Sequence, residues 1–164
     1  MKKIFTVMIL FAIAAGNMDA QSPAFRKGDK VLSFTAGVPY VSTYKSVVPP
    51  VIAGFEYGII DGILEKGAVG IGAYAGFQSF SHFSNILVGA RGAFHFTFVE
   101  KLDTYAGIGL GWRIGMAEDG YTAWTGFSHG EFISARYYFT RSFAVNAELG
   151  YGISSITGGV AFKF

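Results

Sequence analysis

The 164-residue chain contains no cysteine, and this absence excludes two kinds of protein. A disulfide framework, on which small secreted domains often depend, cannot form. The chain also has no cysteine to carry a lipid at a processed amino terminus, so it is not a lipoprotein. Its stability must come from another source.

The chain also lacks a large excess of positive or negative charge, since 13 Lys and Arg nearly balance 11 Asp and Glu. The sequence has no basic stripe and no acidic tail, so we expect no nucleic-acid partner. The three histidines, at positions 82, 95 and 129, lack the spacing of metal ligands. Without cysteine, a zinc site is not expected either, and we predict no cofactor.

The apolar run over residues 4–15 is too short for a membrane-spanning helix, which needs about 20 residues. It follows Lys2 and Lys3, and a short positive region before such a run is typical of a secretory signal peptide. We therefore assign residues 1–20 to a signal peptide and 21–164 to the mature domain. Cleavage after Gly16 instead of Ala20 is the alternative.

What the sequence has in abundance is alternation of large apolar with small or polar residues. In the last nine residues, the large apolar side chains at 156, 160, 162 and 164 share one parity, which indicates a strand with one apolar face. Seven similar segments of about ten residues precede it, the length of a tilted strand that crosses a bilayer. The predicted strands are 30–40, 50–60, 67–77, 86–98, 104–114, 127–139, 142–152 and 155–164.

The less apolar face of these segments decides where the protein is located. It is mostly Gly, Ser and Ala with a few charges, as in the run Gly107, Gly109 and Gly111, whereas the other face carries residues such as Leu32, Phe34 and Ile59. Small residues suit the crowded interior of an eight-stranded barrel, and an outward apolar face is tolerable only in lipid. We predict an all-β, eight-stranded antiparallel up-and-down transmembrane barrel. A soluble, ligand-carrying barrel is the alternative.

The lengths of the connections predict the orientation of this barrel. The links 61–66, 99–103 and 140–141 are short, as periplasmic turns are, whereas 41–49, 78–85 and 115–126 are longer and should face outside. Aromatic residues should form a belt at each rim. The expected members are Tyr40, Tyr44, Phe77, Phe80, Tyr121, Trp124 and Phe127 outside, and Phe98, Tyr138, Phe139, Phe143 and Phe164 at the periplasmic rim.

Three stretches, 86–96, 104–112 and 134–151, resemble the small outer-membrane β-barrel proteins of Gram-negative bacteria, the OmpA/OmpX-like eight-stranded barrels. The closing strand, with Val160, Phe162 and Phe164, resembles the signal by which such barrels are recognised for insertion. The resemblance implies a cell outer-membrane location with both mature termini in the periplasm. Outer-membrane lipids and the barrel-insertion machinery would be its partners, and we expect a monomer. Since this family hosts porins, adhesins and lipid A enzymes, the resemblance does not choose a function.

The most specific site prediction is a polar network in the lumen, formed by Glu56, Arg91, His95, Arg136 and Glu148. Charges inside a narrow lumen must pair, because an uncompensated buried charge is very costly. We expect Arg91 to bridge one or both glutamates, and no acidic partner for His95 is apparent. The network is interpreted as a structural core, and the alternative is a gate that opens a narrow channel.

A catalytic site is not predicted. Ser128, His129 and Glu131 lie close together in one strand, but Ser128 has the opposite parity to the other two and cannot align with them without a bulge. The Gly107 to Gly111 run lies within a strand instead of leading into a helix, so it relieves crowding and does not cradle phosphate. The loop 41–49 could bind an extracellular ligand or be a plain connector.

We therefore predict a non-enzymatic envelope protein with a structural or surface-interaction role. A narrow ion or small-solute channel is the alternative, and a lipid-modifying enzyme ranks third.

Overall fold

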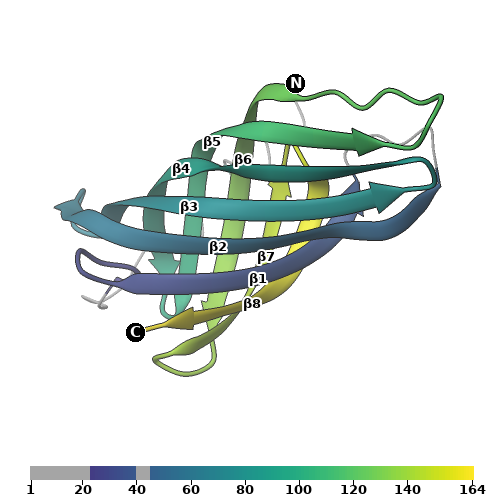
Figure 1. Cartoon of the computed structure of the whole chain (residues 1–164). Coiled ribbons are helices and arrows are strands. Elements are labelled where there is room, and N and C mark those ends of the chain that lie inside the picture. Colours follow the sequence, from purple (N-terminus) through teal and green to yellow (C-terminus); the bar gives the residue numbers. More distant parts are fainter. Residues whose placement is uncertain (1–22, 40–44) are drawn as a thin grey trace, which may run out of the picture.

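In a computed structural model of the chain, eight antiparallel strands form a closed barrel (Figure 1). The structure describes residues 23–39 and 45–164. Each strand pairs with its neighbours in sequence, and β1 pairs with β8 to close the barrel. The strands are β1 (Lys30–Pro39), β2 (Ser46–Ile63), β3 (Gly67–Phe80), β4 (Phe83–Val99), β5 (Leu102–Ala117), β6 (Gly126–Tyr138), β7 (Phe143–Gly150) and β8 (Ser154–Lys163).

The predicted eight-stranded, up-and-down antiparallel architecture is confirmed, and each predicted segment contains a strand. The described residues hold no helix long and apolar enough to cross a membrane. The expected signal peptide, 1–20, lies outside the described residues, as do Tyr40 and Tyr44.

The predicted loops 41–49 and 78–85 are wrong in part, because strands continue into them. Residues 46–49 belong to β2, and only 81–82 separate β3 from β4. At Pro49 and Pro50 the pairing of β2 with β3 is irregular. The ladder between β2 and β1 ends at Val51 of β2, so the two prolines lie just beyond it. At such an edge a proline removes no ladder hydrogen bond.

Large apolar side chains lie on the outside of the barrel, as the alternation predicts. Phe34, Ile71, Val88 and Ile133 are examples from four different strands. One assigned position is wrong: Ile60, not Ile59, is the exposed residue near the end of β2. The register with β3 shifts between Gly58 and Ile60, and such an irregularity reverses the parity of the residues that follow.

The barrel has two distinct ends. At the terminal end, the backbones of Lys30 and Phe164 exchange hydrogen bonds, and the turns 64–66, 100–101 and 139–142 lie there. At the far end lie the connections 81–82, 118–125 and 151–153. The strands β2 to β5 have 14 to 18 residues and β7 has only 8, so the wall is uneven (Figure 1).

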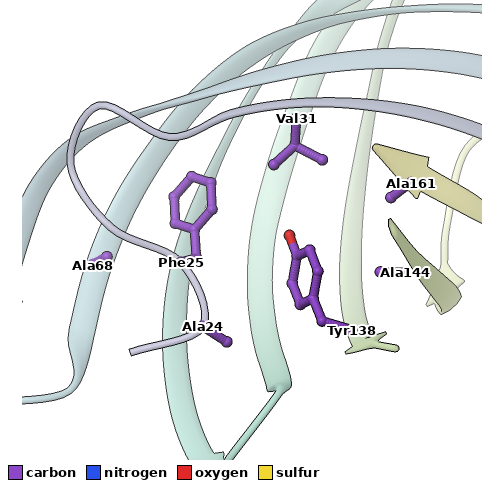
Figure 2. Close-up of a cluster of buried hydrophobic side chains, with 7 residues drawn as sticks. All are labelled: Ala24, Phe25, Val31, Ala68, Tyr138, Ala144 and Ala161. Carbon is purple, nitrogen blue, oxygen red and sulfur yellow. The ribbon is translucent and has the colours of Figure 1, made fainter. Parts of the chain in front are cut away.

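The segment before β1 folds back into the lumen at the terminal end (Figure 2). Phe25 is 1% exposed and joins an apolar cluster with Val31 and Tyr138. The Ala24 amide donates a hydrogen bond to Thr97 Oγ1 over 2.8 Å, and Lys163 Nζ donates to the Ala24 carbonyl over 2.9 Å. This segment therefore fills the terminal mouth of the barrel.

Two aromatic residues assigned to the rim belts are instead inside the lumen. Tyr138 is 4% exposed, and its neighbour Tyr137 is the one that faces outward. Phe80 is also buried and contacts Phe83, with 4.7 Å between their ring centroids. Tyr138 and Phe80 do lie near strand ends, where a rim belt is expected. Each of them, however, occupies an inward-facing position of its strand, so its side chain points into the lumen.

Candidate functional site

Four ionisable side chains from four strands converge in the lumen near the terminal end. Glu56 comes from β2, His95 from β4, Asp103 from β5 and Arg136 from β6, and all four are buried. We call these four residues the lower cluster. The parity of each strand turns these side chains inward, and the narrow barrel then brings them together.

His95 joins two carboxylates in the lower cluster. Its Nδ1 lies 3.0 Å from Asp103 Oδ1, and its Nε2 lies 3.1 Å from Glu56 Oε1. Because each ring nitrogen faces a carboxylate oxygen, which can only accept a hydrogen bond, both nitrogens must carry a hydrogen. The ring is then in its imidazolium form. The ring is also held between Phe25 and Tyr105, with centroid distances of 4.0 Å and 4.7 Å.

Arg136 joins the same two carboxylates from the other side of the lower cluster. Its Nη2 donates to Glu56 Oε2 over 3.0 Å, and its Nη1 lies 3.3 Å from Asp103 Oδ2. Nη2 also donates to the Tyr105 hydroxyl over 3.1 Å. With His95 as imidazolium, two positive groups balance two negative groups, which is the condition under which buried charges persist.

The upper pair, Arg91 and Glu148, lies further toward the far end. Arg91 Nη2 donates to Glu148 Oε2 over 2.9 Å, and Ser134 Oγ donates to the same oxygen over 2.8 Å. The Arg91 guanidinium lies 3.9 Å from the centroid of the Phe132 ring. A cavity of about 50 Å³ beside this pair has room for only a few water molecules.

All five predicted lumen residues lie inside the barrel, and Arg91 pairs with one of the two glutamates expected for it. Arg91 bridges Glu148 and does not hydrogen-bond Glu56, which pairs with His95 and Arg136. The expectation that His95 lacks an acidic partner is wrong, since it contacts both Glu56 and Asp103.

The predicted network lacks Asp103, because the sequence pattern places this residue in the short turn 99–103. In the structure β5 already begins at Leu102, and Asp103 is 0% exposed. Asp103 has an odd residue number, like the inward-facing Gly107 and Gly109, and this shared parity is the signal that its side chain points into the lumen.

Glycines of β4 and β5 leave room for one large inward side chain, Tyr74. A Cβ at Gly111 would lie 3.0 Å from the Tyr74 hydroxyl oxygen, and one at Gly89 would lie 2.9 Å from Cε1 of the ring. At Gly109 the nearest ring atom would be 3.3 Å away. The glycine run thus relieves crowding inside the barrel, as predicted.

Ser128, His129 and Glu131 do not form a catalytic arrangement. Ser128 is buried toward the lumen, whereas His129 and Glu131 are exposed on the outer side, 3.4 Å apart. Among residues 23–39 and 45–164, no group of three or more His, Cys, Asp or Glu side chains could hold a metal ion. The chemistry that the lumen supports is charge pairing.

Comparisons with solved structures identify the architecture. The chain matches a de novo designed transmembrane β-barrel at 15% identity, with a TM-score of 0.57, over 85% of this chain and 98% of that one. It matches the N-terminal barrel domain of Pseudomonas aeruginosa OprF at 16% identity, TM-score 0.58, over 84% and 98%. It also matches the Yersinia pestis outer-membrane protein Ail at 10% identity, TM-score 0.54, over 84% and 100%.

The chain has the fold of a small transmembrane β-barrel. No model of a known protein family matches it, and no curated protein does. At identities of 16% or less, the likeness to these barrels concerns the fold, and the residues of the lumen must supply any argument about function.

Proposed function

We propose that this protein is an integral barrel of the cell outer membrane with a non-enzymatic, structural or surface-interaction role. The observation that carries the proposal is the combination of an apolar outer surface with a lumen filled by paired charges. Buried ion pairs that link four strands support a rigid core, and Ser128 is not aligned with His129 and Glu131 as a nucleophile with its base.

The lengths of the connections support the proposed orientation of the barrel. The longest connection that the structure describes in full, 118–125, lies at the far end, and longer loops face outside in outer-membrane barrels. The terminal end would then face the periplasm. In this orientation Val160, Phe162 and Phe164 at the end of β8 would present the insertion signal to the assembly machinery, and outer-membrane lipids would surround a monomer.

The test of the membrane barrel is electrophoretic. The mature chain, refolded in detergent, should migrate differently before and after boiling, because a closed barrel satisfies its own backbone hydrogen bonds and resists detergent. Identical migration, together with solubility in plain buffer, would contradict the proposal and favour the soluble barrel.

The surface role can be tested with the loop 118–125. Replacing these residues with a short Gly-Ser linker should leave the heat-dependent shift intact but reduce adhesion or envelope integrity in cells. A matched replacement of the turn 139–142, at the opposite end, should leave both cellular properties unchanged. No difference between the two variants in cells would argue against a surface role.

A narrow channel is the second candidate, and one observation favours it. A cavity of about 490 Å³ at the far end and one of about 50 Å³ beside Arg91 and Glu148 are both lined by His129 and residues 151–153. Planar bilayer recordings of wild type and Arg91→Ala test it directly. The absence of conductance steps in both proteins would remove this candidate.

A further inference from the structure

Two ionisable side chains of β6 point out of the barrel, on the face that carries apolar residues elsewhere. His129 and Glu131 share the outward parity of Phe127, and their side chains are 57% and 64% exposed. Nδ1 of His129 lies 3.4 Å from Oε1 of Glu131. Directly across the β5 ladder from Glu131 is Ile108, an exposed apolar residue. An ionisable residue on a lipid-facing wall is costly, so its surroundings need an explanation.

The height of this pair in the wall follows from the tilt of the strands. Hydrogen-bonded partners traced around the barrel from Tyr137 of β6 return to β6 at Phe127, ten residues nearer the far end. With strands about 4.8 Å apart and a rise of about 3.3 Å per residue, this shift tilts the strands by about 40°, so each residue adds about 2.5 Å of height. Phe127 then lies about 25 Å above Tyr137, and Glu131 lies about 15 Å above it.

At this height β5 and β6 present different surfaces to lipid. Because of the tilt, a partner in the next strand lies about 3 Å higher, so Glu131 is level with a point between Ile108 and Leu110 of β5. The outward residues of β5 remain apolar above that point, and Trp112 and Met116 are among them. Outer-membrane barrels present an apolar band about 25 Å tall to lipid. In a flat bilayer β5 would match this band, whereas β6 would hold Glu131 about 10 Å below its upper edge.

On the other side of the pair, the regular wall ends early. β7 has 8 residues and ends at Gly150, and the irregular turn 151–153 follows it. The Tyr151 amide donates to the Glu131 carbonyl over 2.9 Å, and the Tyr151 ring stacks on His129 with 5.9 Å between the centroids. The turn is therefore level with the pair. Irregular backbone that faces lipid does not occur within the hydrocarbon, so the hydrocarbon must end at or below Tyr151 on this side.

We propose that His129, Glu131 and Tyr151 form a surface for lipid headgroups, beside which the outer leaflet is locally thinned. Headgroups and their water reach down to this headgroup surface instead of stopping at the level of Phe127. Glu131 is then solvated, and Tyr151 lies at an interface, where tyrosine is enriched. A bilayer adapts to a short apolar wall by thinning at a modest cost. The inference rests on the proposed function, since it requires an outer-membrane barrel with its far end outside.

The common height of the headgroup surface favours lipid over a second copy of the chain as the occupant. The three residues lie within about 5 Å of one height on two strands of different length. A membrane boundary requires such a common height, whereas contact with another protein does not.

Spin labels on single introduced cysteines test this proposal in vesicles, because the chain has no cysteine of its own. The sites are Leu149 of β7 and Leu110 of β5, both exposed on the outer face. From the ladders and the tilt, Leu110 lies about 4 Å nearer the far end, so a flat bilayer makes the Leu149 label the deeper one. Thinning reverses this order. A water-soluble nickel chelate should then relax the label at Leu149 more than the label at Leu110.

A second pair of labels separates thinning of the outer leaflet from a tilt of the whole barrel. Val145 and Phe94 are exposed at nearly the same height in the lower wall, on β7 and β4. Thinning confined to the outer leaflet leaves these two labels equally deep. A tilt that lowers the far end of β7 would place the label at Val145 deeper than the label at Phe94.

The role of Glu131 is tested by unfolding in bilayers of two thicknesses. In thick dioleoyl phosphatidylcholine, Glu131→Leu should raise the folding equilibrium constant about tenfold, because the carboxylate no longer has to be kept out of hydrocarbon. In thin dilauroyl phosphatidylcholine, where headgroups already reach this height, the change should have little effect. Glu100→Leu, the same change in the turn 100–101 at the opposite end, is the matched control and should show no such difference.

Four results would overturn the proposal. One is a label at Leu149 that the chelate reaches less than the label at Leu110, and another is a label at Val145 deeper than that at Phe94. A label at Leu149 shielded from both the chelate and oxygen would show that a protein, such as a second copy, covers this side. The fourth is an equal effect of Glu131→Leu in the two lipids. A wild-type chain without any heat-dependent shift would instead contradict the proposed function itself.

Discussion

At the residue scale, the lower cluster depends on a balance of charge that no single member can supply. Asp103 accepts from both His95 and Arg136, and it is the member that is fully buried. If its charge is removed, two cations are left facing Glu56 alone. Breaking a buried pair in this way typically costs about 3–5 kcal/mol, far more than an exposed pair contributes.

Asp103→Asn should therefore lower the free energy of unfolding by about 3 kcal/mol. The measurement is urea unfolding of the barrel in lipid vesicles, followed by the fluorescence of Trp112 and Trp124. Asp119→Asn, the same change in the exposed loop 118–125, should shift the midpoint very little. Equal midpoints for the two variants would show that the lower cluster contributes no net stability.

At the element scale, the segment before β1 behaves as part of the core and not as a loose tail. Phe25 covers His95, and Lys163 of β8 holds the backbone at Ala24 and the carboxylate of Asp29. The segment thus connects the first and last strands across the seam that closes the barrel.

Phe25→Ala should destabilise the barrel by about 3 kcal/mol, the usual cost of truncating a buried phenylalanine. The temperature at which the folded band disappears on a gel should fall accordingly. Phe139→Ala, which truncates an exposed phenylalanine in the turn 139–142, should change this temperature little. If both variants melt alike, Phe25 does not seal the terminal end.

The closing strand β8 allows a separate prediction about assembly. Phe164 is 69% exposed, so its side chain contributes little packing to the folded barrel. Phe164→Ser should leave the unfolding midpoint in vesicles almost unchanged but reduce the amount of assembled barrel in cells, since the insertion signal is altered. Normal cellular levels of Phe164→Ser would show that this residue is not read as a signal.

At the scale of the whole molecule, the inside-out distribution of polarity separates the membrane barrel from a soluble one. Phe34 lies on the outer face of β1, flanked across the ladders by Ala53 and Val160. A charge at such a position faces hydrocarbon in a membrane but water in a soluble barrel.

Phe34→Arg should destabilise the barrel in vesicles by about 2–4 kcal/mol, the cost of arginine on the lipid face near mid-depth. Phe34→Leu, which keeps the apolar character, should stay close to wild type. The same vesicle unfolding experiment measures both. A neutral Phe34→Arg substitution would mean that this face does not contact lipid.

The sequence by itself determined the number of strands, the face that most side chains take within a regular strand, and the apolar outer surface. These follow from local alternation, because a strand residue points to one face or the other regardless of what lies across the barrel. Strand ends were less well determined, since β2 to β5 continue beyond the lipid-facing alternation into segments that resembled loops.

Only the tertiary structure decided which charges pair. The parity of each strand predicts a set of inward-facing residues, namely Glu56, Arg91, His95, Arg136 and Glu148. Which of them pair depends on the strand register, because the register sets how deep in the lumen each side chain lies. The same is true of Phe25, whose burial depends on chain reversal before β1. Contacts across the barrel are set by closure of the sheet, and no local pattern in the sequence records them.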